Sequence, residues 1–235
     1  GLGVTGLANA LESLGYLYGS PEFLKAAEEQ VFQPLINNAY AASIELAKEK
    51  GTFPMFDKEK YLSGRFIKGL PKHIQTGIRE HGIRNSHLIS FAPTGTISLV
   101  ADNVSSGIEP VFSPEYIRTI IVDGEPTTQL IKDYGVANLN TVPKTANECS
   151  LNDHLGVLAL ATKYCDSAVS KTINVGENVS WGEFKDIYIK AWKAGCKGCT
   201  TFRAAGKRYG VLNEISTDDI GACYIDPVTG DKSCS

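Results

Sequence analysis

The clearest periodic pattern of apolar residues lies near the start of the chain. Apolar side chains recur every three or four positions from Phe23 to Leu46, which is the spacing of one buried helix face. Ser20 followed by Pro21 is typical of a helix N-terminus, and Gly51 is suited to end a helix. The pattern therefore predicts one long helix of nearly 30 residues.

Further along the chain, short apolar runs alternate with helical patterns. The strands predicted from these runs are residues 87–92, 116–122, 168–174 and 199–203, and the helices are residues 150–164 and 181–194; residues 71–81 form a short amphipathic stretch within the mixed region 52–86. In the last helix we expect Trp181, Tyr188 and Trp192 to be buried. Strand, helix and strand in succession make a βαβ unit, so the sequence predicts an α/β fold of parallel strands backed by helices.

Composition narrows the class of protein. The chain has 235 residues, 43% of them hydrophobic, and a formal charge of −3, which argues against a protein that coats nucleic acid. No apolar stretch approaches the roughly 20 residues of a membrane span, and the first 20 residues do not resemble a signal peptide. With six cysteines and no secretory signal, we expect reduced thiols and a cytoplasmic protein without membrane or nucleic-acid partners.

The first six residues, Gly-Leu-Gly-Val-Thr-Gly, match the G-x-G-x-x-G dinucleotide fingerprint. That fingerprint needs a strand before the glycines and a second strand ending in an acidic residue about 20 residues later. Here the later position falls in the predicted long helix, and no strand precedes Gly1. We therefore interpret these glycines as a closely packed helix start.

Residues 93–98, Pro-Thr-Gly-Thr-Ile-Ser, connect a predicted strand to a short helical pattern. A helix N-terminus exposes backbone N–H groups, and two threonine hydroxyls beside it would complete an anion cradle. The loop lacks the lysine and the spacing of a Walker A motif. An anion site and an ordinary strand-to-helix turn both remain open at this point.

Cys196 and Cys199 form a C-x-x-C pair between a predicted helix and a predicted strand. Thioredoxin-like motifs have the opposite order, and a zinc site needs two further ligands. We favour structural thiols, with a redox pair or zinc site as alternatives. The four histidines show no metal-ligand spacing, and His87 is expected to be a hydrogen-bonded core residue; no metal site is predicted.

Residues 84–112 closely resemble the signature region of ribonucleotide reductase large subunits. The loop at residues 93–98 and the following Asn-Val-Ser-Ser-Gly-Ile-Glu-Pro at 103–110 are similar to the adenosylcobalamin-dependent class in particular. Three further segments match in the same order, at residues 1–15, 166–174 and 195–212. The resemblance therefore spans nearly the whole chain.

The resemblance implies a ten-stranded α/β barrel, with residues 1–212 as the C-terminal part and residues 213–235 as a tail. It also implies an enzyme that converts ribonucleotides to 2′-deoxyribonucleotides by thiyl-radical chemistry for DNA synthesis. The family's Asn-x-Cys-x-Glu motif does not occur in this sequence. We therefore expect the radical cysteine, its Asn and its Glu in an upstream half of the barrel, before Gly1, and expect this fragment alone to be inactive.

The same resemblance assigns a binding site and partners. The residues that match the substrate-phosphate loop are Pro93, Thr94, Gly95, Thr96, Ile97 and Ser98. The implied substrate is a ribonucleoside di- or triphosphate, the cofactor is adenosylcobalamin, and the reductant is of the thioredoxin type. Cys223 and Cys234 lie near the position of a terminal redox pair in the family. The alternative is a non-catalytic phosphate-binding or scaffolding module derived from the same barrel.

Overall fold

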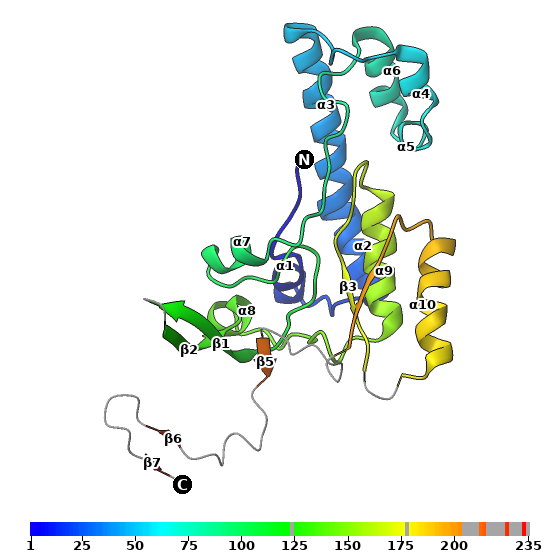
Figure 1. Cartoon of the computed structure of the whole chain (residues 1–235). Coiled ribbons are helices and arrows are strands. Elements are labelled where there is room, and N and C mark those ends of the chain that lie inside the picture. The colour runs from blue at the N-terminus through cyan, green and yellow to red at the C-terminus, as the bar shows by residue number, and fades with distance from the viewer. Residues whose placement is uncertain (123–124, 177–178, 204–211, 215–223, 226–231, 234–235) are drawn as a thin grey trace.

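The computed structural model describes residues 1–122, 125–176, 179–203, 212–214, 224–225 and 232–233. The predicted long helix is confirmed (Figure 1). It comprises α2 (Pro21–Ala26), a π-helical segment (Ala27–Phe32) and α3 (Gln33–Lys50). The Ser20 hydroxyl accepts a hydrogen bond from the Phe23 backbone N–H, and Gly51 ends the helix with φ of 76°. Capping and periodicity were therefore sufficient to predict this element.

Four chain segments lie side by side in parallel and in the order of the sequence. Leu2 pairs with Ile89, and Phe91 pairs with Val169. The third segment continues as β3 (Thr172–Asn174), which pairs with β4 (Thr200–Phe202). The predicted βαβ unit is confirmed, because α10 (Trp181–Lys193) connects β3 to β4. In the described residues only β3 and β4 form a regular parallel sheet; the predicted strand at residues 87–92 makes isolated bridges at Ile89 and Phe91, and the four segments do not close into a barrel.

The remaining elements surround this sheet. The helices are α1 (Leu7–Ser13), α4 (Lys58–Ser63), α5 (Arg65–Lys68), α6 (Lys72–His81), α7 (Gly95–Val100), α8 (Tyr134–Leu139) and α9 (Leu151–Lys163). The strands are β1 (Glu115–Val122), β2 (Glu125–Lys132), β5 (Leu212–Glu214), β6 (Tyr224–Ile225) and β7 (Lys232–Ser233). β1 pairs antiparallel with both β2 and β5. Of these, α4, α5, α8, β2, β5, β6 and β7 were not predicted from the sequence.

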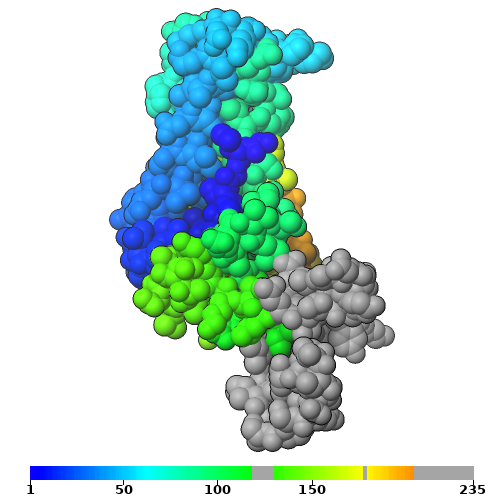
Figure 2. All heavy atoms as spheres, turned by 90° about the vertical axis from the view of Figure 1, so that its left-hand side faces the viewer, coloured from blue at the N-terminus to red at the C-terminus, as the bar shows by residue number. Residues whose placement is uncertain are grey.

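The main apolar core lies where α1, α2, α3 and the segment around Ile89 meet. Tyr18, Phe23, Tyr40 and Ile89 are each fully buried there. A smaller core cluster lies between α9, β3 and α10. The helices α4 to α6 extend from the far end of α3, so the molecule is elongated, as Figures 1 and 2 show. No helix of the described residues is long and apolar enough to cross a membrane.

Two expectations about buried side chains were wrong. In α10, Trp181 and Trp192 are 74% and 75% exposed, and Tyr188 is also exposed, while Ile187 and Ala191 are buried. Helical periodicity identifies the direction of an apolar face but does not show how much of that face a neighbouring element covers. His87 is also exposed, with its ring next to the Ser86 hydroxyl. The predicted strand around it therefore becomes buried only from Leu88 onward.

Candidate functional site

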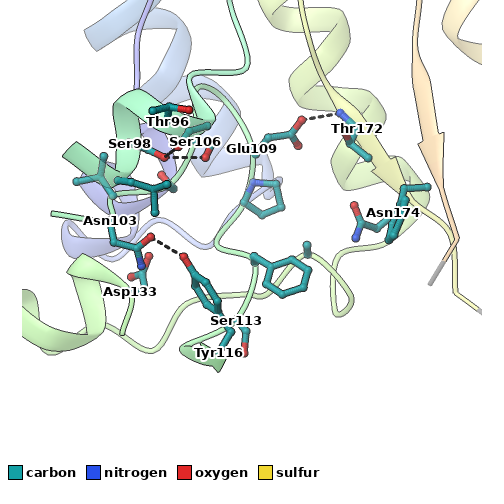
Figure 3. A pocket seen from close by; sticks show the side chains of 18 residues that line it. Thr96, Ser98, Asn103, Ser106, Glu109, Ser113, Tyr116, Asp133, Thr172 and Asn174 are labelled. Carbon is teal, nitrogen blue, oxygen red and sulfur yellow. Dashed lines mark hydrogen bonds between the residues drawn. The ribbon is translucent and has the colours of Figure 1, made fainter. Parts of the chain in front are cut away.

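A cleft of about 500 Å³ opens beside α7. Its walls come from α7, from the segment after it at residues 103–113, and from the first residues of β1. Thr172 and Asn174 of β3 and Phe202 of β4 line the opposite side (Figure 3). The cleft therefore lies where the parallel strands meet the loops that follow them.

The loop at residues 93–98 borders this cleft at the start of α7. Thr94 is the N-cap residue and has a left-handed backbone conformation with φ of 52°. A β-branched residue is strained in this conformation, and strain of this kind is often found at functional sites. The first hydrogen bond of the helix runs from the Ser98 N–H to the Thr94 carbonyl. The N–H groups of Gly95, Thr96 and Ile97 therefore have no acceptor within the helix.

The six predicted loop residues divide into two groups. Gly95, Thr96 and Ser98 line the cleft, and Thr96 is exposed. Ser98 is buried, and its hydroxyl donates to the Gly95 carbonyl at 2.8 Å. Pro93, Thr94 and Ile97 lie outside the lining of the cleft. The Thr96 hydroxyl is therefore the predicted side-chain donor that is both exposed and directed to the cleft region (Figure 3).

The Thr94 hydroxyl holds the loop together. It accepts a hydrogen bond from the Gly107 N–H at 2.7 Å and lies 2.9 Å from the Thr5 hydroxyl. Thr5 in turn donates to the Ser105 carbonyl, and the Gly6 N–H donates to the same carbonyl at 2.7 Å. The first residues of the chain thus tie the start of α7 to the segment that follows it.

The glycines at positions 1 and 3 allow a close approach of two backbones. A Cβ atom on Gly3 would lie 2.5 Å from the Ser90 carbonyl oxygen, and one on Gly1 would lie 2.8 Å from the Ser90 Cβ. Gly6 has φ of 74° at the start of α1. The interpretation of this segment as a closely packed helix start is confirmed: packing accounts for Gly1 and Gly3, and the positive φ accounts for Gly6.

A buried charged cluster that was not predicted from the sequence lies on the β3 side of the cleft. The Lys171 ammonium lies 2.5 Å from Glu109 Oε2, 2.9 Å from His154 Nδ1 and 2.5 Å from the Thr172 carbonyl. Glu109 Oε1 accepts from the Thr172 N–H at 2.6 Å (Figure 3). The signal that could have revealed this cluster is a lysine within an apolar strand pattern, because a buried lysine needs a partner.

A second acidic group lies on the opposite wall. Asp133 is buried, and its Oδ1 accepts hydrogen bonds from Asn9 Nδ2 and the Gly135 N–H, both at 2.8 Å. Burial raises the pKa of this carboxyl above its ordinary value. Asn9 also accepts from the Ser105 N–H at 2.5 Å. Asn9 therefore connects α1 to the wall of the cleft that contains Ser105 and Asp133.

The four cysteines that the structure describes show no sign of activated thiolates. Cys149, Cys165, Cys196 and Cys199 are free thiols, and burial raises the pKa of each of them. A nucleophilic thiolate needs the opposite shift, which favours a structural role. No group of three or more metal-binding side chains occurs in the described part of the chain. Cys223 and Cys234 lie outside the described residues.

Comparison with known sequences agrees with this architecture. The family model described as "Ribonucleotide reductase, barrel domain" matches residues 1–202. A vitamin B12-dependent ribonucleoside-diphosphate reductase of Mycobacterium tuberculosis is 31% identical over 92% of this chain and 32% of its own length. A protein of the same description from Thermoplasma acidophilum is 30% identical over 90% of this chain and 29% of its own. A ribonucleoside-diphosphate reductase subunit alpha of Mycoplasma pneumoniae is 28% identical over 83% of this chain and 31% of its own.

The four parallel segments, which end in β3 and β4, and the loop at residues 93–98 are therefore a portion of a ribonucleotide reductase barrel. The chain belongs to the ribonucleotide reductase family, and among the relatives named here the two that are at least 30% identical are vitamin B12-dependent. It spans about one third of the length of these relatives.

Proposed function

We propose that this chain forms the substrate-phosphate-binding part of a vitamin B12-dependent ribonucleotide reductase. The observation that carries the proposal is the first turn of α7, whose N–H groups lack helix acceptors at the rim of the cleft. Anions bind at such sites because several N–H donors converge on one point. The substrate would be a ribonucleoside di- or triphosphate, with residues 1–212 as the barrel part and residues 213–235 as a tail.

In this proposal the residues of the loop have two different tasks. The N–H groups of Gly95, Thr96 and Ile97 and the Thr96 hydroxyl donate hydrogen bonds to the phosphate. The Thr94 hydroxyl, held by Gly107 and Thr5, keeps the first turn of α7 in position. A rigid loop binds a phosphate more tightly because less conformational freedom is lost on binding.

The reaction itself needs groups outside this chain. The radical cysteine with its Asn and Glu would come from the other half of the barrel, and Cys223 and Cys234 would receive electrons from a thioredoxin-type reductant. Adenosylcobalamin would supply the radical. His154, the buried histidine, has both ring nitrogens engaged, by Ala146 and Lys171, so it does not fit as a ligand to cobalt. We assign no described residue to the cofactor.

The test compares two threonine variants in the complete reductase that contains this segment. Thr96→Ala should raise KM for a ribonucleoside diphosphate or triphosphate about tenfold, as expected for loss of a hydrogen bond to a charged group, with a smaller change in kcat. Thr76→Ala is the matched control, because Thr76 is an exposed threonine on α6 away from the cleft. Equal KM values for Thr96→Ala and the wild type would exclude the loop assignment.

A second experiment, on the isolated chain, tests whether the chain is catalytically incomplete. The isolated chain, supplied with adenosylcobalamin, a dithiol and a ribonucleotide, should give no deoxyribonucleotide. Turnover by the isolated chain would show that the radical machinery lies within these 235 residues and would overturn the proposed division of the barrel.

A further inference from the structure

The Lys171 side chain is completely inaccessible to solvent, although it carries an ammonium group. Its three donors are matched by three acceptors, which belong to Glu109, His154 and Thr172. A buried charge of this kind is tolerated only when it is paired and fully hydrogen-bonded. The Lys171–Glu109 ion pair thus occupies a buried position that an apolar side chain could also fill.

His154 completes the cluster as a neutral acceptor. Its Nε2 lies 3.1 Å from the Ala146 carbonyl and donates to it, so Nδ1 is left to accept from Lys171. Burial, together with the nearby Lys171 charge, lowers the pKa of His154 to about 3. The cluster therefore holds one positive charge on Lys171 and one negative charge on Glu109.

The position of the pair relative to the cleft gives it a consequence for binding. Glu109 lines the cleft and its side chain is 22% exposed, whereas Lys171 lies behind it. Asp133 is the other acidic residue in the lining, and the described lining residues include no lysine or arginine. A carboxylate without a counter-charge would repel an anion that enters this cleft.

We propose that Lys171 is the counter-charge of the cleft, a positioning residue that neutralises Glu109 and so allows a polyphosphate to bind next to a carboxylate. The proposal rests on the proposed function, because it takes the phosphate of the substrate as the anion. Glu109 has a structural role: its two oxygens join the segment after α7 to β3 through Lys171 and the Thr172 N–H. The positive charge of Lys171 offsets the repulsion that the Glu109 carboxylate would otherwise exert on an anion in the cleft.

The experiment separates charge from structure with three variants of the complete reductase. Lys171→Met removes the counter-charge and leaves the Glu109 carboxylate facing the cleft. The double variant Lys171→Met with Glu109→Gln removes both charges while the amide oxygen still accepts from the Thr172 N–H. Lys144→Met is the matched control, because it breaks the partly buried 2.8 Å ion pair with Asp153 outside the cleft lining. The readouts are the dissociation constant of inorganic pyrophosphate, KM and kcat for the ribonucleotide, and Tm.

If Lys171 acts through charge, Lys171→Met should weaken pyrophosphate binding and raise KM about tenfold, the effect of one unit charge roughly 10 Å away at an effective dielectric of about 20. The double variant should return to within about threefold of the wild type, even if its Tm stays low. High salt should reduce the defect of Lys171→Met because added ions screen the repulsion. Lys144→Met should lower Tm without weakening pyrophosphate binding.

A purely structural role predicts a different pattern. The double variant would then bind pyrophosphate as weakly as Lys171→Met, since both lack the connection made by the ammonium; this result, or wild-type affinity in Lys171→Met, overturns the proposal. If Lys171→Met does not fold, Glu109→Gln decides, because it should tighten pyrophosphate binding and a weakening would contradict the counter-charge. Failure of Thr96→Ala to alter KM, with the Lys171 pattern intact, would instead refute only the loop assignment.

Discussion

Two glycine-containing segments of this chain look alike in sequence and differ in structure. In the segment at residues 1–6, a Cβ on Gly3 would collide with the Ser90 carbonyl oxygen at 2.5 Å. In the segment at residues 93–98, a Cβ on Gly95 would have no atom within 4 Å. The first segment precedes α1, and the second continues into the first turn of α7. The first glycine permits close packing, whereas the second leaves open space beside a helix N-terminus.

The comparison shows that a glycine-rich segment by itself does not identify a phosphate site. What distinguishes the two segments is the environment of their N–H groups. The Gly6 N–H donates to the Ser105 carbonyl, and the Leu7 N–H lies 3.5 Å from the Gly107 carbonyl, so the start of α1 is turned toward protein acceptors. The start of α7 borders the cleft instead.

The largest effect is expected at Gly3. Gly3→Ala places a methyl group against the Ser90 carbonyl, so the paired backbones must separate. Overpacking of this kind should destabilise the chain by about 2–3 kcal/mol. Thermal unfolding of the chain measures it, and a Tm equal to that of the wild type would contradict the close packing.

The next effect concerns His154 of α9, a buried residue outside both glycine-containing segments. His154 has a pKa of about 3 in the folded chain, below its ordinary value of 6.5, so the unfolded chain binds the extra proton. The stability that neutral His154 contributes is therefore complete above pH 6.5 and is lost as the pH falls toward 3. Between pH 6.5 and 5 the loss should reach about 1–2 kcal/mol.

The control for this prediction is His154→Gln, measured by urea unfolding at each pH. Glu12 works in the opposite direction, since burial raises its pKa to about 7 and its contribution to stability is lost as the pH rises from 4.5. Because Glu12 is present in both proteins, it cancels in their difference. The stability difference between wild type and variant should shrink as the pH falls; a constant difference would mean that His154 does not titrate as a buried neutral group.

A smaller loss of stability is expected at Thr94. Thr94→Ala removes the nearer of two acceptors of the Gly107 N–H, at 2.7 Å against 3.3 Å for the Thr5 hydroxyl, and the partner of that hydroxyl, which should destabilise the chain by about 1 kcal/mol. It should also raise KM in the complete reductase, because the first turn of α7 is no longer fixed. Thr5→Ala should reproduce part of both effects, and its full stability in unfolding experiments would argue against the connection.

The smallest effect is expected at Gly95, the counterpart of Gly3. Gly95→Ala meets no neighbouring atom, so its stability should lie within about 0.5–1 kcal/mol of the wild type or slightly above it, since alanine has less freedom to lose on folding. Thermal unfolding beside Gly3→Ala makes the comparison direct. A loss as large as that of Gly3→Ala would show that the two segments are packed alike.

Much of the secondary structure could be predicted from local patterns. The Ser20 cap, the three-to-four spacing after it and Gly51 define the long helix, and Ser180 with Glu183 forms the capping box of α10. These features depend on residues close together in the sequence, so they can be recognised without the fold. The strand β2 was missed because its sequence shows no regular alternation of apolar and polar residues. What defines it as a strand is its antiparallel pairing with β1.

The loop at residues 93–98 was located by its sequence, but the division of labour within it was not. Thr94 and Thr96 are equivalent candidates in the sequence, and the structure engages Thr94 with Gly107 and Thr5 while Thr96 faces the cleft region. Those contacts join positions about 10 to 90 residues apart, as the hydrogen bonds of Thr94 show. No local pattern contains that information.

The sequence by itself determined the long helix, α9 and α10, the βαβ unit, the position of the loop and the resemblance to a family, because each depends on short-range spacing or on residue order. Only the tertiary structure decided which glycines are packed, which hydroxyl is available, and that Lys171, Glu109 and His154 meet behind the cleft. The physical reason is that burial and pairing are properties of the three-dimensional neighbourhood. Lys171 lies in an apolar strand pattern where a charge is unfavourable by itself, and its partner Glu109, 62 residues away in the sequence, makes its burial possible.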